Sequence, residues 1–224
     1  MKAMILAAGR GERMRPLTDT LPKPLIPVQG RPLIEWHLLK LAKCGIKEVV
    51  INTAWLSQKL VTHLGNGEQF GLKILWSHED ALGLETAGGI IHALELLGKA
   101  PFCVVNGDIW TDYDFTNLPK DLGSKLGHLV LVDNPSHHPE GDFGLDSKRL
   151  VSESAPKYTF SGISVLRPEL FQDIATGRRT LRSVFAPAIA NKQLTGEKYQ
   201  GIWTDVGTPA RLAELESTLA EVFR

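Results

Sequence analysis

Apolar, strand-like runs alternate with segments of helical periodicity through the first half of the chain, and this alternation constrains the fold more than any other feature. Residues 2–8 are almost continuously apolar and end in a glycine-rich turn, which is typical of a strand buried on both faces. Further strands are predicted at residues 47–53, 72–76 and 102–106, and helices at residues 31–44, 55–64 and 85–97. Short links between such elements favour right-handed βαβ units around a mostly parallel, Rossmann-like sheet flanked by helices.

The second half of the chain is less regular but continues the same pattern. Strands are predicted at residues 127–133, 159–166 and 196–206, and a helix at residues 181–190 in spite of Pro187. Thr208 is expected to cap a last helix that carries Pro209 in its first turn. Because neither a linker nor a repeat interrupts the pattern, we predict an α/β fold in a single domain over residues 1–224.

The chain has no net charge, with 25 basic and 25 acidic residues. A neutral chain lacks an overall field that would draw it to nucleic acid or to an anionic membrane, so an anionic ligand must be held by local charges. No window approaches the roughly 20 apolar residues of a membrane span. Cys44 and Cys103 stand in apolar surroundings, as expected of reduced thiols. We therefore expect a cytoplasmic protein without a nucleic acid, membrane or obligate protein partner.

Residues 6–28 carry the strongest functional signal, LAAGRGERMRPLTDTLPKPLIPV. Gly9 and Gly11 follow the first strand at its carboxyl end, the edge at which open α/β sheets bind ligands. Glycines allow the backbone to approach a phosphate group closely and to turn its N–H groups toward it. Arg13 and Lys23 bring two cations to the same loop, as a triphosphate requires. The segment is not a P-loop, since no Gly-Lys-Ser/Thr follows.

This segment resembles the signature of the sugar nucleotidylyltransferases, which joins Leu-Ala-Ala-Gly-x-Gly-x-Arg to Pro-Leu-Thr and Pro-Lys-x-Leu-x-Pro. The resemblance implies the nucleotide-diphospho-sugar transferase fold, with the nucleotide bound by about residues 1–115 and the sugar by about residues 116–224. It assigns Arg13 and Lys23 to catalysis, where they would stabilise charge at the α-phosphate. Backbone contacts to base, ribose and phosphates would come from Leu6, Ala8, Gly9 and Gly11.

Two acidic residues match the family's metal-binding positions. Asp108 follows the predicted strand 102–106 within FCVVNGDIWTD, and Asp205 lies in WTDVGT. Mg²⁺ takes one or two carboxylates from a protein and completes its shell with water and phosphate. The resemblance therefore implies a Mg²⁺ ion held by Asp108 and Asp205, whereas Asp112 and Asp114 fit turn or capping roles.

Further matches imply contacts to the base and the sugar. The segment ETAGG opens a predicted helix where the family reads the base, so Glu85 and Gly88 are assigned to the nucleotide. Asn106, at the end of the predicted strand 102–106, is assigned to the nucleotide as well. Many relatives have glycine at the position of Glu85, and a glutamate there also fits helix capping. Segments near residues 142–145, 151–156 and 160–163 resemble those that bind the sugar, which assigns this role to Asp142, Gly144, Glu153 and Gly162.

The implied reaction is Mg²⁺-dependent transfer of a nucleotidyl group from UTP to a sugar 1-phosphate, with release of pyrophosphate. The loops around Glu85, Asp142 and Phe160 resemble those of family members that act on N-acetylmuramate 1-phosphate, and this resemblance implies that sugar as the acceptor, in a step of peptidoglycan recycling. The lactyl carboxylate of this sugar needs a cation, for which the candidates are Arg31, Lys157 and Arg182.

Two other functions stay open on the sequence. One is a mannose 1-phosphate guanylyltransferase with the same chemistry and a purine pocket. The other is a non-catalytic regulatory subunit that binds a nucleotide sugar, although the presence of Arg13, Lys23 and both aspartates argues against it. His137 and His138 fit a solvated loop or lid better than a metal site.

Overall fold

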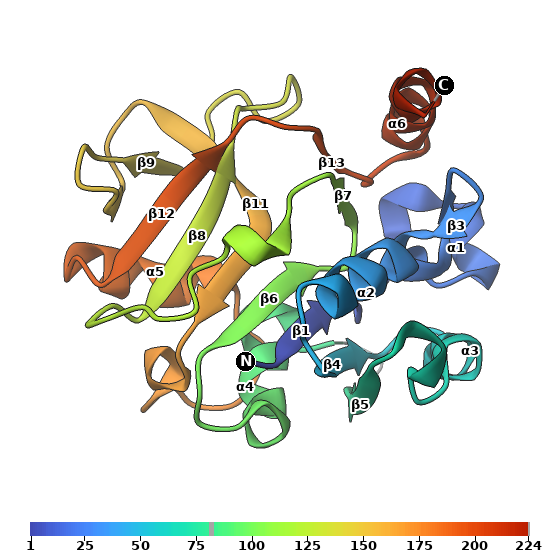
Figure 1. Cartoon of the computed structure of the whole chain (residues 1–224), viewed down its shortest axis with the longest axis horizontal. Coiled ribbons are helices and arrows are strands. Elements are labelled where there is room, and N and C mark those ends of the chain that lie inside the picture. The colour runs from blue at the N-terminus through green and yellow to red at the C-terminus, as the bar shows by residue number, and fades with distance from the viewer. Residues whose placement is uncertain (81–82, 224) are drawn as a thin grey trace.

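A central sheet runs through the computed structural model, which describes residues 1–80 and 83–223 (Figure 1). In its first half, β1 pairs in parallel with β4 on one side and with β6 on the other, and β4 pairs in parallel with β5. These four strands are β1 (Ala3–Leu6), β4 (Glu48–Thr53), β5 (Lys73–His78) and β6 (Phe102–Asn106). All four carboxyl ends therefore meet at one edge of the sheet, where ligands bind in folds of this kind.

The second half adds strands to the β6 side of the same sheet. The long strand β11 (Lys157–Leu166) pairs antiparallel with β6 and with β8 (Gly127–Val132), and β8 pairs in parallel with β12 (Leu194–Tyr199). Because β8 and β12 run in the direction of β1, β11 is the reversed strand among these. Two short strands, β9 (Phe143–Leu145) and β10 (Val151–Ser152), extend the sheet beyond β11. The predicted mostly parallel α/β sheet is confirmed.

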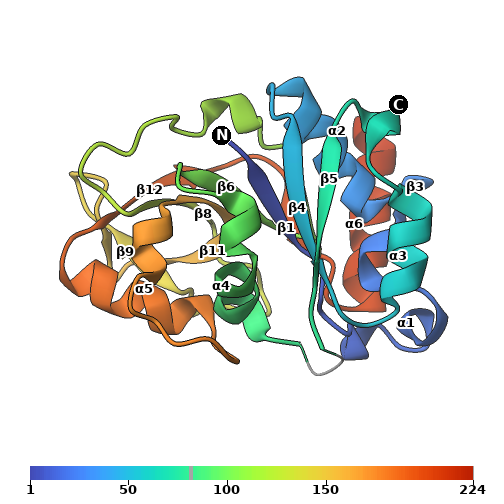
Figure 2. The same cartoon turned by 90° about the horizontal axis from the view of Figure 1, so that it is seen from below.

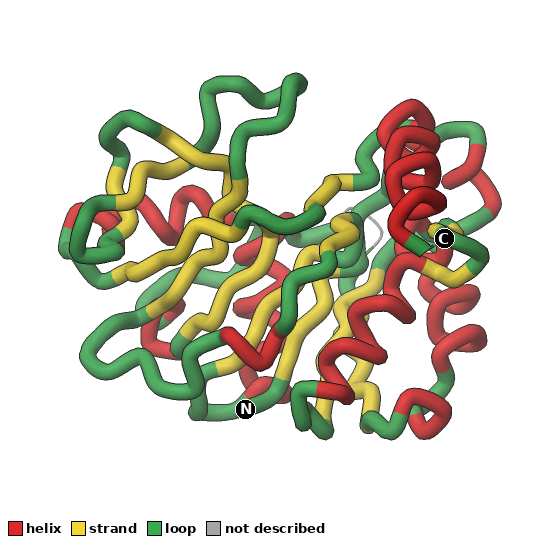
Figure 3. The backbone as a smooth tube through the Cα atoms, turned by 45° about the horizontal axis from the view of Figure 1, so that its top comes forward, coloured by secondary structure: helices red, strands yellow, loops and turns green. Residues whose placement is uncertain are grey.

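Helices cover both faces of the sheet, because side chains on each buried strand alternate between the faces. Ile5 packs in one cluster with residues of α2 (Leu33–Lys43) and α3 (Ser57–Leu64). Its neighbour Met4 packs in another with α4 (Glu85–Leu97) and α5 (Leu181–Ala190). Figure 2 shows α2 and α3 on one side of β1 and β4, with α4 on the other, and Figure 3 shows the strands as one band between helices.

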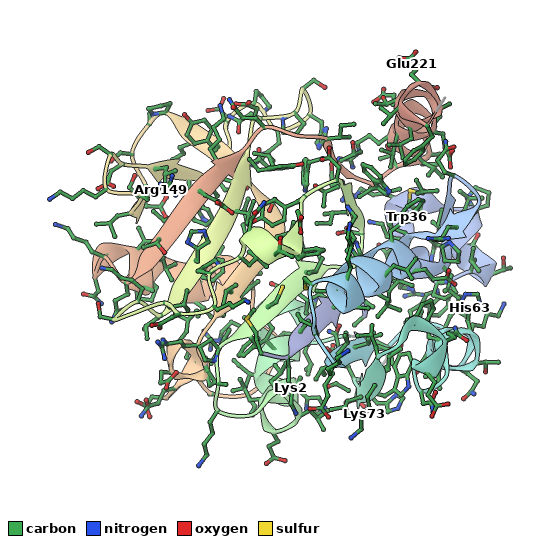
Figure 4. The ribbon with its side chains drawn as sticks, viewed as in Figure 1. Lys2, Trp36, His63, Lys73, Arg149 and Glu221 are labelled. Carbon is green, nitrogen blue, oxygen red and sulfur yellow. The ribbon has the colours of Figure 1, made fainter. Side chains whose placement is uncertain are left out.

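The last helix, α6 (Pro209–Val222), packs back on the first half of the chain. Its Leu215 and Leu219 share a buried cluster with Met14 of the glycine-rich loop. Trp36 of α2 lies toward α6, where its ring stacks on Phe223 with 6.2 Å between the ring centroids (Figure 4). As predicted, Thr208 caps the helix, since its hydroxyl accepts a hydrogen bond from the Arg211 N–H at 3.3 Å.

Short elements complete the chain and position the loops. The strands are β2 (Pro27–Val28), β3 (Arg31–Pro32), β7 (Ile109–Thr111) and β13 (Trp203–Asp205), with a short helix α1 (Leu17–Thr20). Single 3₁₀ turns lie at Glu12–Met14, Lys23–Leu25, Glu68–Phe70, Phe115–Asn117 and Pro168–Phe171. No helix in residues 1–80 or 83–223 combines the length and apolar character that a membrane crossing requires.

The predicted strand at residues 196–206 is wrong in one respect, because it is two strands in two sheets. β12 ends at Tyr199, and β13 pairs with β7 in a separate antiparallel ladder. The break falls at Gly201, where a Cβ atom would collide with the Tyr199 hydroxyl. The predicted helix at residues 31–44 also begins later, because residues 31–32 pair with β2. The predicted bounds of α4, β6 and α5 are confirmed.

We expect Leu219→Ala to lower the free energy of unfolding by about 2–5 kcal/mol, because the truncated side chain leaves a cavity in the cluster under the glycine-rich loop. Leu219 is 0% exposed. Val222 on the same helix is 56% exposed, so Val222→Ala should change stability by less than about 0.5 kcal/mol. Urea unfolding of both variants measures the difference, and equal losses would contradict the docking of α6.

Candidate active site

A cavity of about 750 Å³ opens at the carboxyl ends of β1 and β6. Its walls come from the loop after β1, the start of α4 and the loop after β6. Most of the residues predicted to hold the nucleotide line it, namely Leu6, Ala8, Gly9, Gly11, Arg13, Lys23, Glu85 and Asn106. Asp108 also lines this cavity. Local sequence signals from three separate segments therefore converge on one site.

Gly11 gives the loop its shape. Its φ of 67° lies in the left-handed region, which favours glycine. A Cβ atom here would come within 2.9 Å of Thr18 Cγ2 and 3.2 Å of Lys23 Cβ. The Thr18 hydroxyl donates a hydrogen bond to the Gly11 carbonyl at 2.8 Å. The absence of a side chain at Gly11 thus allows the loop to pack directly against Lys23.

Lys23 is buried at the floor of the cavity and is held by Asp108. Its Nζ donates to Asp108 Oδ2 at 2.7 Å, and the residue is only 8% exposed. This ion pair preorganises the ammonium group, since a charge held in place needs no reorganisation when an anion binds. Arg13 is exposed, lines the cavity and has no ion-pair partner among the described residues, so its guanidinium is available to an anionic ligand.

Two side chains of α2 form hydrogen bonds to β7, the strand that follows Asp108. The buried His37 donates through Nε2 to the Ile109 carbonyl at 2.8 Å. Burial, together with the nearby charge of Lys40, lowers the pKa of His37 to about 4, so this imidazole is neutral at pH 7. Burial also lowers the pKa of Lys40 to about 8, and its ammonium donates to the Thr111 carbonyl. These contacts fix β7 and with it the direction in which Asp108 points.

A second cavity of about 360 Å³ adjoins the first and shares Arg13, Asn106 and Asp108 with it. Asp205 lines this second cavity. Asp108 and Asp205 are brought together because β13 pairs with β7 and the Val206 N–H donates to the Asp108 carbonyl at 2.7 Å. The rest of the lining is Ile109, His137, His138, Thr159, Phe160, Ser161, Trp203 and Arg211.

Asp205 lies against two residues that the sequence analysis did not assign to the site, Arg211 and His137, of which His137 was considered only as part of a solvated loop or lid. Arg211 donates through Nη1 to Asp205 Oδ2 and to His137 Nε2. His137 Nε2 also lies 3.0 Å from Asp205 Oδ1, although not in hydrogen-bond geometry. Arg211 could have been found, because the cap at Thr208 turns the first residues of α6 back toward Asp205. His137 could not, because the path of its loop is set by tertiary contacts.

The two aspartates fit a hard divalent cation. Oδ1 of Asp205 is buried and has no hydrogen bond in the described part of the chain. An orphaned carboxylate oxygen beside a second carboxylate is a donor set that suits Mg²⁺, which takes one or two carboxylates and fills its shell with water and phosphate. Within residues 1–80 and 83–223, no three His, Cys, Asp or Glu side chains form a cluster that could hold a metal ion.

The start of α4 contributes Glu85 but not Gly88 to the described lining of the first cavity. Glu85 lines the first cavity with a φ of 63°, which is strained for any residue but glycine. Its carboxylate pairs with Arg178 at 2.6 Å and makes no capping hydrogen bond. Gly88 does not contribute to the described lining. Its N–H donates to the Arg179 carbonyl at 3.1 Å, and a Cβ atom on it would collide with the Gly177 carbonyl oxygen. Gly88 therefore serves the packing of the loop at residues 177–179.

The residues predicted to bind the sugar lie behind the lining of the second cavity. Asp142 Oδ2 accepts a hydrogen bond from the Phe160 N–H at 2.8 Å. Gly162, with a φ of 81°, allows β11 to pass Asn106, whose Nδ2 would lie 2.6 Å from an added Cβ atom. Gly144 is packed against the Ser154 backbone. Asp142 and Gly162 thus support the walls formed by Phe160 and Asn106, whereas Gly144 lets the chain pass close to Ser154.

Glu153, also predicted to bind the sugar, forms an exposed ion cluster. Its Oε2 lies 2.8 Å from Arg182 Nη2 and 3.3 Å from Lys157 Nζ. Arg31, the third cation considered for a lactyl carboxylate, lies over the Trp36 ring at 5.0 Å from its centroid. Within the described chain, Arg31, Lys157 and Arg182 are all outside the lining of both cavities.

Comparisons with known proteins identify the family of the chain. A family model described as nucleotidyl transferase matches residues 2–222. The N-acetylmuramate alpha-1-phosphate uridylyltransferase of Neisseria meningitidis serogroup B is 50% identical over 228 residues, covering 97% of each chain. The enzyme of that name from Caulobacter vibrioides is 33% identical, covering 98% of this chain and 97% of its own.

A solved structure of a Bacillus anthracis protein in complex with sucrose shares the fold, with a TM-score of 0.83 at 24% identity. The match covers 97% of this chain and 94% of the other. The family model, the sequence relatives and the solved structure all match nearly the whole chain. The protein therefore belongs to the nucleotidyl transferase family, among the sugar 1-phosphate nucleotidyltransferases.

Proposed function

We propose that this protein transfers UMP from UTP to N-acetylmuramate 1-phosphate, with Mg²⁺, and releases pyrophosphate. The observation that carries the proposal is the pair of adjoining cavities that share Arg13, Asn106 and Asp108. The larger cavity has room for a nucleotide and the smaller one for a sugar, so their phosphate groups would meet at the shared residues. Identity of 50% to the Neisseria enzyme supports this choice of substrates. In the cytoplasm the reaction would return a cell-wall sugar to peptidoglycan synthesis.

The reaction needs little from the protein beyond position and charge. The phosphate of the acceptor is already an anion, so no general base has to remove a proton. One of its oxygens attacks the α-phosphorus in line with the departing pyrophosphate. Lys23, fixed by Asp108, and Arg13, at the junction of the two cavities, would neutralise the charge that develops on the phosphoryl oxygens. Holding both substrates in this alignment supplies the remaining rate enhancement.

Asp108 and Asp205 would hold the Mg²⁺ ion at the boundary of the cavities. When bound, such an ion screens the phosphate charges and acts as a Lewis acid toward phosphoryl oxygens. Arg211 keeps Asp205 in place from the side of the second cavity, and His137 in turn accepts a hydrogen bond from Arg211.

Recognition of an anionic sugar would fall to Arg211. It lines the second cavity with a side chain that is only 12% exposed. A guanidinium group binds a carboxylate through a planar, two-pronged contact that a lysine cannot reproduce. The three cations predicted from the sequence lie outside the described lining of both cavities, namely Arg31, Lys157 and Arg182.

Lys23→Ala is expected to lower kcat by about 10²–10³-fold, because it removes a preorganised charge contact to the transition state. Lys43→Ala is the matched control, since Lys43 is exposed at the end of α2. Pyrophosphate release with UTP and the sugar 1-phosphate measures both variants. Equal, small effects would contradict the role of the loop.

Asp108→Asn and Asp205→Asn should each abolish Mg²⁺-dependent turnover while the circular dichroism spectrum stays unchanged, because an amide is a much weaker ligand than a carboxylate. Asp114→Asn should stay close to the wild type, since the side chain of Asp114 accepts a hydrogen bond from the Thr116 N–H and asparagine can do the same. Near-normal activity of either of the first two variants would remove that residue from the metal site.

Substrate choice is tested with four nucleoside triphosphates and several sugar 1-phosphates. We expect the largest kcat/KM for UTP with N-acetylmuramate 1-phosphate. Arg211→Lys should lower the preference for this sugar over N-acetylglucosamine 1-phosphate about tenfold, since hydrogen bonds between charged groups contribute about 1.5–3 kcal/mol. Arg182→Gln should leave the preference unchanged. A preference for GTP with mannose 1-phosphate would support the guanylyltransferase alternative, and binding without turnover would support the regulatory one.

A further inference from the structure

Asn52, at the carboxyl end of β4, extends the pairing of β4 with β1 by one side-chain hydrogen bond. The backbone ladder pairs Leu6 with Asn52. Oδ1 of Asn52 then accepts a hydrogen bond from the Ala7 N–H at 2.7 Å, where the glycine-rich loop begins. Asn52 is only 2% exposed and still contributes to the lining of the larger cavity. It therefore fixes the point at which the loop leaves the sheet.

The amide of Asn52 continues this contact to Glu79, the residue after β5. Asn52 Nδ2 donates to Glu79 Oε1 at 2.6 Å. The other carboxylate oxygen, Glu79 Oε2, accepts from the Leu84 N–H at 2.8 Å, next to the start of α4. A chain of hydrogen bonds thus runs from Ala7 through Asn52 and Glu79 to Leu84, along one wall of the larger cavity.

The polarity of this chain is fixed at both ends by backbone N–H groups, which can only donate. The Ala7 N–H requires an acceptor, which places Oδ1 of Asn52 toward Ala7 and its NH₂ group toward Glu79. The Leu84 N–H requires an acceptor as well. Both oxygens of Glu79 must therefore accept, which a carboxylate does and a neutral amide cannot. Glutamate at this position is dictated by the two donors that it faces.

Gly89 of α4 leaves the space that the pair occupies. A Cβ atom on Gly89 would lie 2.6 Å from Glu79 Oε1 and 2.7 Å from Asn52 Nδ2. A side chain at Gly89 would separate Asn52 from Glu79 and break the hydrogen bond between them. The second glycine of the ETAGG segment is thus explained by its closeness to Asn52 and Glu79.

We propose that Asn52 and Glu79 are positioning residues that couple the phosphate-binding loop to the opposite, base-side end of the nucleotide cavity. The pair, which we call the Asn52–Glu79 brace, holds Ala7 and Leu84 at a set separation, so that both ends of a nucleoside triphosphate meet preformed contacts. A preformed site avoids the cost of ordering the loop when the ligand binds. The inference rests on the larger cavity being the nucleotide site.

The test exchanges the polarity of the brace. Glu79→Gln leaves a donor facing either the Leu84 N–H or the Asn52 amide. Asn52→Asp leaves two carboxylates facing each other. Each single variant should weaken nucleotide binding about tenfold, the usual effect of one unsatisfied buried hydrogen-bonding group.

The double variant, Asn52→Asp with Glu79→Gln, restores a consistent pattern of donors and acceptors. The carboxylate introduced at position 52 accepts from the Ala7 N–H and from the NH₂ group introduced at position 79. The carbonyl oxygen of that new side-chain amide then accepts from the Leu84 N–H. Every group in the chain of hydrogen bonds has a partner again, so nucleotide binding should recover.

The measurement is the Kd of UTP by titration calorimetry, with KM for the sugar 1-phosphate beside it. We expect the double variant to bind UTP within about threefold of the wild type, and KM for the sugar to stay unchanged throughout. Asn66 and Glu68 give a matched control, because Asn66 Nδ2 donates to Glu68 Oε1 at 2.8 Å in an exposed pair outside both cavities. Asn66→Asp and Glu68→Gln should leave the Kd of UTP unchanged.

A second measurement keeps the test decisive if a single variant folds poorly. Hydrogen exchange should show the Ala7 and Leu84 amides less protected in the single variants and protected again in the double variant. Wild-type affinity in both single variants, or a double variant no better than the worse single one, would overturn the proposal. If the wild type binds another triphosphate more tightly than UTP, the proposed substrate is wrong, and the same exchange tests the brace with that nucleotide.

Discussion

The ion pair between Lys23 and Asp108 is the interaction on which the rest of the site depends. It joins the loop after β1 to the end of β6 with 2.7 Å between Nζ and Oδ2. Pairing with a carboxylate offsets part of the cost of burying the Lys23 ammonium group, whose residue is only 8% exposed. Gly11 must then lie against the Lys23 side chain, which sets the course of the loop. The shared wall of the two cavities follows from this one contact.

The parts of this arrangement that depend on neighbours in the sequence could be predicted. Continuous apolar runs indicated the buried strands, and the bounds of α4 and β6 agree with the periodicity of residues 85–97 and 102–106. The glycine-rich loop follows β1 directly, so its place at the carboxyl edge of a parallel sheet follows from topology alone. The resemblance paired Asp205 with Asp108, and the structure brings them together because β13 pairs with β7 outside the central sheet.

Features that depend on how deeply a side chain is buried, or on partners distant in the sequence, could not be predicted. The residues Asp142 and Gly162, assigned to the sugar by resemblance, contact the lining of the second cavity, but whether a residue lines a cavity or supports its wall depends on side-chain direction. Asn52 and Glu79 are 27 residues apart in the sequence, and nothing in either segment marks the hydrogen bond between them. The break between β12 and β13 arises because Tyr199 bonds to Asp112 and occupies the space beside Gly201. Tertiary contacts here override a continuous strand pattern.

Charge balance explains why the site draws on both ends of the chain. Two carboxylates at adjacent strand ends repel each other, and phosphate groups nearby add to the negative charge. Asp108 is matched by Lys23 from the first loop, whereas Asp205 is matched by Arg211 from the last helix. Leu215 and Leu219 pack α6 against Met14 of the same first loop, so the two cations are held relative to one another by a shared apolar cluster. In a chain of zero net charge, this packing balances the two carboxylates within the site itself. The last helix is therefore an electrostatic part of the site as well as a cover for the core.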